Sequence, residues 1–323
     1  MKYKISVVIP IYGVEKFIGR CVESLMQQTL KDVEYIFVND CTKDNSMKIL
    51  LEILSKYPNN NTRIINKDVN EGLPKARKSG VEIATGEYIY HIDSDDWLEY
   101  NALEEMYSVA SKANTDILCC GFFKDYADHT ELCLGEPISS PSSGISKMLY
   151  SEKKLHSGVW AKLVRKDLYT NVKYPTSYMH EDLVLMIQLF HFAKTVKYLP
   201  KAFYHYRQDN TQSIIKQDSI KRYKSAAINF HFLIEFMKQE GIEEKYRKEL
   251  MYRINAFKTF SLVNGRLLDP SLYKESNKLI FSCNAVTKFM PKFYTFCAIY
   301  NCPYIWESVN RIKTFLKKII NKK

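Results

Sequence analysis

Acidic side chains that could bind a metal follow one apolar segment of this sequence. Asp93, Asp95 and Asp96 come directly after the apolar run Tyr88–Ile92. Alternate carboxylates at a strand end can reach one ligand, and a carboxylate together with diphosphate oxygens often holds Mg²⁺ or Mn²⁺. An Asp-x-Asp triplet alone is weak evidence. Asp95 or Asp96 could instead cap a helix that begins near Trp97–Asn101.

A second acidic pair, Glu181-Asp182, precedes an apolar run with helical spacing, Leu183–Phe190. Both acids are therefore expected in the first turn of a helix. The helix macrodipole favours carboxylates there whatever their function. The residues alone leave a purely structural role open.

The first 120 residues alternate apolar runs with helical patterns, which is typical of a parallel sheet covered on both faces. The expected elements are a strand at Ile5–Ile9, a helix over Val14–Met26, a strand at Val33–Val38, a helix near Ser46–Lys56, a strand at Arg63–Ile65, a helix opening at Leu73-Pro74 and a strand at Tyr88–Ile92. This order predicts a doubly wound α/β sheet, in which ligands bind at the carboxyl ends of the strands. Asp40 and the 93–96 cluster should therefore converge on one crevice.

The remainder of the chain carries weaker signals. The Pro/Ser/Gly-rich stretch Pro137–Gly144 is expected to be a loop. Beyond about Gln208 the sequence looks helical and polar-aromatic, without a clear motif. We therefore expect two parts, a catalytic domain over residues 1–210 and a helical C-terminal extension over residues 211–323.

Composition indicates a globular protein, because 46% of the 323 residues are hydrophobic. The eight cysteines form no Cys-x-x-Cys pair and no cluster at zinc spacing, so they are expected to be reduced thiols. No secretory leader or membrane-spanning run is apparent, and we expect a cytoplasmic protein.

The net charge of +11 is compatible with nucleic acid, an anionic membrane or phosphate-bearing ligands. Between Ile305 and Lys323, six basic residues alternate with apolar ones at helical spacing. This segment could lie peripherally on the inner face of the cell membrane or pack its apolar stripe on the protein. No RNA-binding signature accompanies the charge, so no nucleic-acid partner is expected.

Ordered motifs over about the first 210 residues resemble family 2 glycosyltransferases of the bacterial polysaccharide type, which have the GT-A fold. The matching segments are Ser6–Tyr12, Glu34–Ser46, Asn70–Arg77, Gly86–Ile89, Asp93–Asp96 and Glu181-Asp182. The joint occurrence of these segments in the correct order is far more specific than any one of them. No named motif covers the C-terminal third.

The resemblance implies a nucleotide-binding pocket made by Pro10, Tyr12 and Asp40. An aromatic face and one fixed acceptor can read a base at little entropic cost. Arg77 stands where the family keeps an arginine near the nucleotide, and a guanidinium suits a base oxygen or a phosphate. Three bland alternatives remain: a core or turn aromatic for Tyr12, an Asx-turn for Asp40, and a solvated helix residue for Arg77.

The resemblance also implies the chemistry. Asp93 would contact the ribose or the metal shell, and Asp95 would coordinate Mn²⁺ or Mg²⁺ that bridges both phosphates. Asp182 would be the general base that takes the proton of the acceptor hydroxyl, so that the configuration inverts. Glu181 would help to orient the acceptor.

Two further segments resemble the family less specifically. Trp160–Leu163 would lie near the acceptor, and His205–Arg207 with Ser213 would close over the donor, although a surface salt bridge or a buried ring is an equal alternative.

The sequence also departs from the family pattern at three positions. The family more often has aspartate at Asn39, glycine at Cys41 and asparagine at Lys78. Cysteine disfavours the positive φ that glycine allows, which puts the backbone at Cys41 in question.

The predicted function is therefore an inverting hexosyltransferase or N-acetylhexosaminyltransferase. It would move a sugar from a nucleotide-diphosphate donor, above all a UDP-sugar, to a hydroxyl of a growing glycan or lipid-linked saccharide. A nucleotidyltransferase of related fold is the alternative enzyme. A non-catalytic sugar-nucleotide or glycan-binding module is the third candidate, although it would not need to retain Asp93, Asp95 and Asp182.

Overall fold

The computed structural model of the protein describes residues 3–151, 154–210, 219–265, 269–281 and 289–300. Two compact units are present. The first comprises residues 1–148 and 152–216, and the second comprises residues 149–151 and 217–323. The segment 305–323, for which the sequence predicts a basic amphipathic helix, lies outside the described residues.

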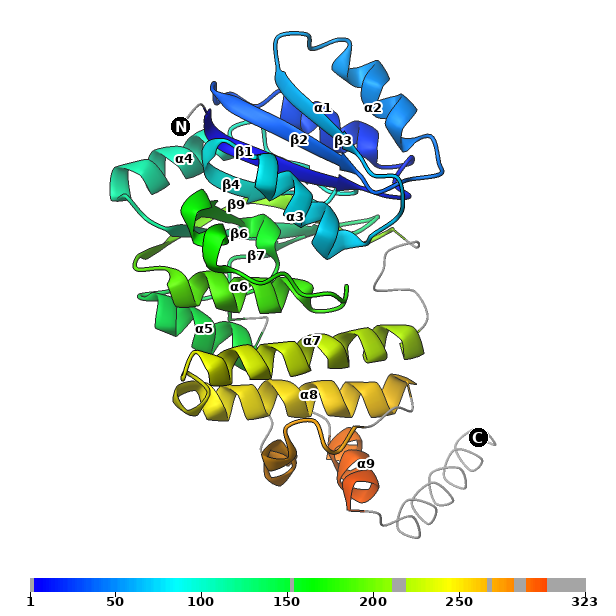
Figure 1. The fold of residues 1–323 in the computed structure, drawn as a ribbon, viewed down its shortest axis with the longest axis vertical. Coiled ribbons are helices and arrows are strands. Elements are labelled where there is room, and N and C mark those ends of the chain that lie inside the picture. Colours follow the sequence, from blue (N-terminus) through cyan, green and yellow to red (C-terminus); the bar gives the residue numbers. More distant parts are fainter. Residues whose placement is uncertain (1–2, 152–153, 211–218, 266–268, 282–288, 301–323) are drawn as a thin grey trace. The chain divides into compact units, whose positions relative to one another are not determined.

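The first unit is built on a nine-stranded sheet whose strand order is β3-β2-β1-β4-β8-β6-β9-β5, with β7 paired to β6 (Figure 1). The strands are β1 (Tyr3–Ile11), β2 (Val33–Asn39), β3 (Asn61–Asn66), β4 (Gly86–His91), β5 (Trp97–Leu98), β6 (Ile117–Asp125), β7 (Thr130–Cys133), β8 (Lys162–Arg165) and β9 (Val196–Arg207). The first four strands run parallel, and β8 joins β4 to β6 by antiparallel pairing. The predicted doubly wound, mostly parallel sheet of the GT-A type is confirmed.

Helices cover both faces of this sheet. They are α1 (Ile18–Met26), α2 (Ser46–Leu54), α3 (Leu73–Ile83), α4 (Ala102–Ala113) and α6 (Glu181–Phe192), with short 3₁₀ turns η1 (Val159–Ala161) and η2 (Lys166–Asn171). Helix α5 (Pro141–Tyr150) packs on α6. Ile5, Val7 and Ile9 of β1 share one core cluster with the buried side chains of α1. Alternation along the strand turns Val8 to the opposite face, where α3 packs (Figure 1).

Helix α3 approaches the sheet very closely at Gly80. A Cβ atom at this position would lie 2.4 Å from Cγ1 of Val8 and 3.3 Å from Cγ2 of Val38. Only a residue without a side chain allows this spacing. Because Arg77 lies three residues earlier on the same helix face, the close packing also fixes where its side chain starts.

Two expectations about local structure are wrong. Pro137–Gly144 is not entirely loop, since α5 begins at Pro141. Gly144 serves there as a packing residue rather than a breaker, because a Cβ atom would lie 2.2 Å from the ring of Phe190.

The second error concerns the segment after the 93–96 cluster. Trp97 and Leu98 form β5, which pairs with β9. The next helix, α4, begins only at Ala102 and has Asn101 at its N-cap position. Asp95 and Asp96 therefore do not cap a helix, and pairing with a distant strand has overridden the local helical pattern.

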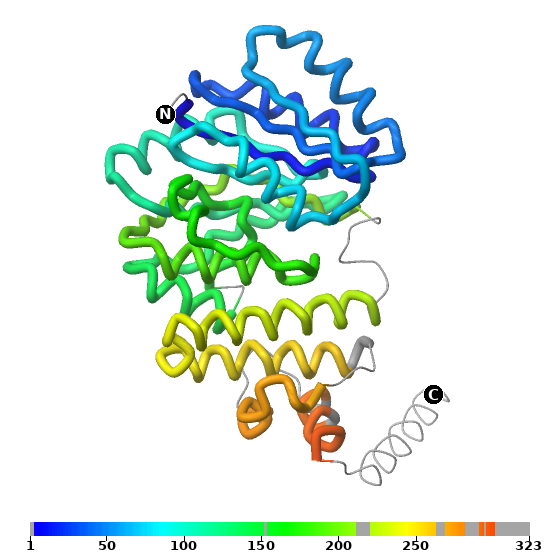
Figure 2. The backbone as a smooth tube through the Cα atoms, in the orientation of Figure 1, coloured from blue at the N-terminus to red at the C-terminus, as the bar shows by residue number. Residues whose placement is uncertain are grey.

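The second unit is helical, as the sequence beyond residue 208 predicts. Its elements are α7 (Ser219–Gln239), η4 (Glu244–Tyr246), α8 (Arg247–Gly265), η5 (Lys274–Leu279) and α9 (Phe289–Ile299), and Figure 2 traces their backbone. Among the residues that the structure describes, no helix is long and apolar enough to cross a membrane.

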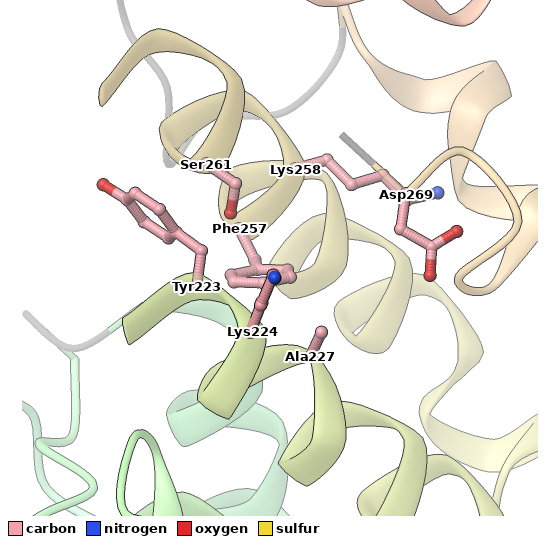
Figure 3. A pocket seen from close by; sticks show the side chains of 7 residues that line it. All are labelled: Tyr223, Lys224, Ala227, Phe257, Lys258, Ser261 and Asp269. Atoms are coloured by element: carbon pink, nitrogen blue, oxygen red, sulfur yellow. The ribbon is translucent and has the colours of Figure 1, made fainter. Parts of the chain in front are cut away.

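A small pocket of about 160 Å³ lies within the helical unit (Figure 3). Its lining consists of Tyr223, Lys224, Ala227, Phe257, Lys258, Ser261 and Asp269. Lys258 is buried and donates to the Oδ1 atom of Asn277 at 2.7 Å and to the hydroxyl of Ser276 at 3.1 Å. Burial lowers the pKa of Lys258 to about 8, against the opposing effect of Asp269. This lysine therefore ties α8 to η5.

The close approach of α3 to the sheet gives a direct test. Gly80→Ala should lower the free energy of unfolding by about 1–3 kcal/mol, because the added methyl group overpacks Val8 by more than alanine gains in helix propensity. Gly19→Ala is the matched control, since its nearest neighbour would be Cδ1 of Ile53 at an ordinary 3.7 Å. Urea denaturation that shows equal effects for both variants would contradict the packing argument.

Candidate active site

The turn after β4 is anchored by Asp96 and Ser94. The hydroxyl of Ser94 donates to the carbonyl of Pro10 at 2.7 Å, and the amide of Asp96 donates to the carbonyl of Asp93 at 3.0 Å. The buried Asp96 carboxylate accepts from the Tyr204 hydroxyl at 2.5 Å and from the Arg207 amide at 2.8 Å. With Asp96 and Ser94 turned inward, Asp93 and Asp95 are the partly exposed acids of the turn.

Arg77 of α3 joins this turn to the acidic pair of α6. Its Nη2 atom contacts Oδ1 of Asp93 at 2.6 Å, and its Nη1 atom contacts Oδ1 of Asp182 at 2.5 Å. Nη1 also forms an ion pair with Glu181. One guanidinium group therefore gathers three carboxylates from two distant parts of the chain.

The exposure of Arg77 is 1%, which excludes the solvated helix residue considered from the sequence. Burial by itself would lower the pKa of Arg77, but Asp182 and Asp93 more than compensate and the pKa is raised. The group is therefore firmly cationic. Its described partners are carboxylates, while a contact with a nucleotide stays a prediction.

The two acids at the start of α6 differ in access. Both lie in the first helical turn, as expected, after His180 in a left-handed conformation. The side chain of Glu181 is 2% exposed, whereas that of Asp182 is 25% exposed. Asp182 is therefore the member of the pair that a ligand can reach.

Asp93 sits in a crowded electrostatic environment. Burial above all, together with Asp182 and Asp95, raises its pKa to about 6 against the opposing effect of the Arg77 guanidinium. Its side chain is still 27% exposed, so a ligand could reach it. The carboxyl group therefore holds its proton to a higher pH than an ordinary aspartate does.

Asp95 is the acid of this turn that could bind a metal ion together with another ligand. Its Oδ2 atom accepts from Asn210 at 2.8 Å, and its backbone carbonyl accepts from Nε of Arg207 at 3.0 Å. Within the described ranges, no three His, Cys, Asp or Glu side chains are grouped to hold a metal ion by themselves. A cation at Asp95 could take its remaining oxygen ligands from water or from a bound molecule.

Asp40 holds the start of α3 in place. Its Oδ1 atom accepts from the Glu71 amide at 2.9 Å, and its Oδ2 atom accepts from the Gly72 amide at 2.8 Å. The Asx-turn alternative for Asp40 is therefore wrong, because the loop is closed instead by Asn39, whose Oδ1 atom accepts from the Thr42 amide at 2.9 Å. Contact of Asp40 with a nucleotide base remains a prediction.

Tyr12 lies just beyond β1 and is 54% exposed, so the core-aromatic alternative does not apply to it. Pro10 lies within β1 and is tied to the 93–96 turn through Ser94. The predicted pocket residues thus lie at the carboxyl ends of neighbouring parallel strands.

Cys41 takes up the left-handed conformation that the sequence put in question, with φ of 59°. Its Sγ atom lies 3.3 Å from the carbonyl of Asp68 and 3.2 Å from Nζ of Lys43. The backbone therefore keeps the shape that a glycine would have favoured, at some conformational cost.

The His205 side chain is packed among aromatic rings and acids. The imidazole stacks between Trp97 and Phe123, with ring centroids 4.9 and 4.7 Å away. Its nitrogens lie 2.8 Å from Asp125 and 2.9 Å from Glu99. The ring is therefore packed and lies between two acids, as the alternatives to a donor contact describe. Closure of His205 and Arg207 over the donor stays a prediction, and Ser213 lies outside the described residues.

Trp160 and Lys162 are also enclosed. The indole of Trp160 stacks on Tyr204 with centroids 4.4 Å apart, and Nζ of Lys162 donates to the carbonyls of His156 and Gly158 at 2.7 and 2.6 Å. Contact of this segment with an acceptor stays a prediction.

Comparison with known proteins places the chain. Residues 6–168 match the family model of glycosyl transferase family 2. The putative glycosyltransferase EpsH of Bacillus subtilis (strain 168) is 31% identical over an alignment of 256 residues that covers 76% of this chain and 72% of that protein. The chain therefore belongs to glycosyl transferase family 2 and is a glycosyltransferase, which decides against the nucleotidyltransferase and the non-catalytic module.

Solved structures show the same fold. The crystal structure of S. aureus TarS 1–349 in complex with UDP-GlcNAc has a TM-score of 0.65 at 20% identity and covers 87% of this chain and 81% of its own. The mannosyltransferase PcManGT from Pyrobaculum calidifontis, in complex with GDP-Man and Mn²⁺, has a TM-score of 0.54 at 12% identity and covers 92% and 86%. At these identities the likeness shows the GT-A fold alone.

His91, at the end of β4, is a buried titratable group that sequence reasoning missed. It is 1% exposed, and its Nε2 atom lies 3.2 Å from the hydroxyl of Tyr169. Burial above all, together with the nearby Arg77, lowers its pKa to about 3 against the opposing effect of Asp182. The imidazole is therefore neutral in the folded protein at neutral pH.

This burial predicts a loss of stability in acid. Because the unfolded chain binds a proton near pH 6.5 and the folded chain does not, His91 should reduce the free energy of unfolding by about 2 kcal/mol between pH 7 and pH 5. His91→Gln cannot titrate and should flatten the profile by that amount, whatever its stability at pH 7. Parallel profiles of the two proteins in urea denaturation would contradict a neutral buried His91.

Proposed function

We propose that this glycosyltransferase moves a sugar from a nucleotide-diphosphate donor, a UDP-sugar in the first place, to a hydroxyl of a growing glycan or lipid-linked saccharide, with inversion. The observation that carries the proposal is the placement of the accessible Asp182 carboxylate beside the 93–96 turn, to which Arg77 links it. The donors named in the titles of the TarS and PcManGT structures, UDP-GlcNAc and GDP-Man, are nucleotide-diphosphate sugars and support this class of donor.

Asp182 is the proposed general base. Arg77 contacts its Oδ1 atom, which leaves Oδ2 for the proton of the acceptor hydroxyl. As that proton moves to the carboxylate, the acceptor oxygen forms a bond to the anomeric carbon. The bond from this carbon to the diphosphate breaks on the opposite face, so the nucleoside diphosphate leaves and the configuration inverts.

Asp95, with Asp93 beside it, would hold Mn²⁺ or Mg²⁺ together with oxygens of the donor diphosphate. Carboxylate oxygens suit these hard cations, and phosphate oxygens of the donor with water would complete the shell. When bound, such a cation offsets the negative charge of the leaving diphosphate. Asp96 takes no part in this, because its carboxylate is occupied by Tyr204 and Arg207.

Tyr12 and Asp40 would bind the nucleotide base. The exposed ring of Tyr12 offers a stacking face. Asp40 is only 3% exposed, so it would meet the base at the edge of its carboxylate, through lone pairs that the two amide bonds leave open. Since the Pro10 carbonyl accepts from Ser94, this base site would be tied to the diphosphate site.

A divalent cation should be required for turnover. With UDP-glucose, UDP-galactose and UDP-N-acetylglucosamine as donors and p-nitrophenyl glycosides as acceptors, UDP release should stop in excess chelator and return on addition of MnCl₂. Asp95→Ala should lose turnover and UDP affinity together, because metal and diphosphate would bind as a unit. Asp128→Ala, which removes an 85% exposed acid, is the matched control. Full turnover in chelator would refute the metal assignment.

The base should be separable from donor binding. Asp182→Asn keeps size and much hydrogen bonding but removes the proton acceptor, so kcat should fall roughly 10²–10⁴-fold. The dissociation constant of UDP with Mn²⁺, measured by calorimetry, should change little.

Near-native turnover of Asp182→Asn at saturating substrates would place the base elsewhere, with Glu181 the next candidate. Joint loss of UDP binding and fold stability would instead show that the carboxylate only stabilises the first turn of α6.

A further inference from the structure

The Arg77 side chain contacts the proposed base but takes no part in proton or sugar transfer. We infer that Arg77 is a positioning residue, which fixes Asp182 relative to the donor-side Asp93, and that the buried Glu181 holds Arg77 in place. This inference rests on the proposed function, in which Asp182 is the base. It differs from the nucleotide contact that the sequence suggested for Arg77.

The geometry of the guanidinium suits a bridge. Its two terminal nitrogens point to different carboxylates, Nη1 to Asp182 at 2.5 Å and Nη2 to Asp93 at 2.6 Å. A planar guanidinium fixes the angle between two such bonds, whereas a lysine ammonium is a single point charge on a flexible stem. The bridge therefore sets the base oxygens relative to the donor-side turn.

The elements that carry the bridge have little freedom. Arg77 lies on the part of α3 that packs closely on the sheet at Gly80. Asp93 lies in the turn that Ser94 and Asp96 anchor. Helix α6 is buried over Leu183–Phe190. The backbone of a base on such a helix is fixed. The contacts of its side chain therefore determine where the carboxylate lies.

Arg77 is the partner that the described residues provide for the Glu181 side chain. This side chain is 2% exposed, and the ion pair with Arg77 is the contact that the described residues provide for its carboxylate. A buried carboxylate without a partner would be costly. Glu181 therefore supplies the counter-charge that keeps Nη1 beside α6, which leaves Asp182 to face the ligand.

Arg77→Lys tests the bridge, because it keeps one positive charge among the carboxylates but removes the fork. With the donor and acceptor pair that the UDP-sugar panel selects, kcat should fall roughly 10–100-fold, the scale of a misplaced catalytic group. The dissociation constant of UDP with Mn²⁺ should stay within about threefold, since the donor side keeps its charge balance. A direct nucleotide contact predicts the reverse, with weaker UDP binding and near-native kcat at saturating donor.

Arg63→Lys is the matched control. Arg63 lies on β3, is 46% exposed on its side chain, and donates to the carbonyl of Ile83 at the end of α3. The same chemical change there should leave kcat and the UDP dissociation constant unaltered.

A double-mutant cycle separates this inference from the proposed function. If Arg77 acts through Asp182, then Arg77→Lys should lower kcat in the native background but have little further effect in the Asp182→Asn background. Equal effects of Arg77→Lys in both backgrounds would overturn the positioning role while leaving the base intact. A native kcat for Asp182→Asn would instead overturn the base assignment and the inference with it.

Glu181→Gln keeps the inference testable if Arg77→Lys fails to fold. The amide keeps the shape of the side chain and one acceptor but removes the counter-charge, so kcat should fall about 3–10-fold with unchanged UDP affinity. The effect should vanish in the Asp182→Asn background. A loss of kcat that persists there, or no loss at all, would contradict the role of Glu181.

Discussion

A single buried guanidinium group must satisfy three carboxylates, and this constraint organises the site. A charge with 1% exposure is tolerable only when its partners are placed well, and breaking a buried pair leaves an uncompensated charge. Arg77 therefore requires that α3, the turn after β4 and the first turn of α6 meet at fixed distances. The close packing at Gly80 and the anchoring of the turn by Asp96 meet this requirement.

The sheet order explains why the predicted residues that follow β1, β2 and β4 can meet. Because β1 pairs in parallel with both β2 and β4, the segments after these strands lie at one edge. Two of the non-glycine residues with positive φ, Cys41 and His180, belong to this region, one after β2 and one before α6. Strained backbone that persists at a site is a sign that the surroundings over-determine it, which fits a preorganised pocket.

Much of the fold was predictable because its signals are local. The apolar runs of β1, β2 and β4 and the first turn of α6 can be recognised from neighbouring residues alone. The errors arose where a partner distant in sequence determines the local structure. Trp97 is in a strand because it pairs with β9, and Gly144 lies in a helix that packs against Phe190.

The candidate site shows the same limit. Asp95 and Asp96 are identical in chemistry and adjacent in sequence, so only the bonds from Tyr204 and Arg207 assign them to different work. The three-carboxylate environment of Arg77 depends on contacts across up to 105 residues and had no local signal.

The charge balance of the site also constrains what can bind there. Three carboxylates surround one guanidinium, and Asp95 adds another acid beside them. Burial is the main cause of the raised pKa of Asp93, about 6, and the surplus acids Asp182 and Asp95 add to it. A diphosphate would bring further negative charge to the same place, and like charges a few ångströms apart repel strongly in a partly dry site. A divalent cation that arrives with the donor would offset the surplus negative charge at Asp95. Arg77 could then keep its contact with Asp182, the proposed base.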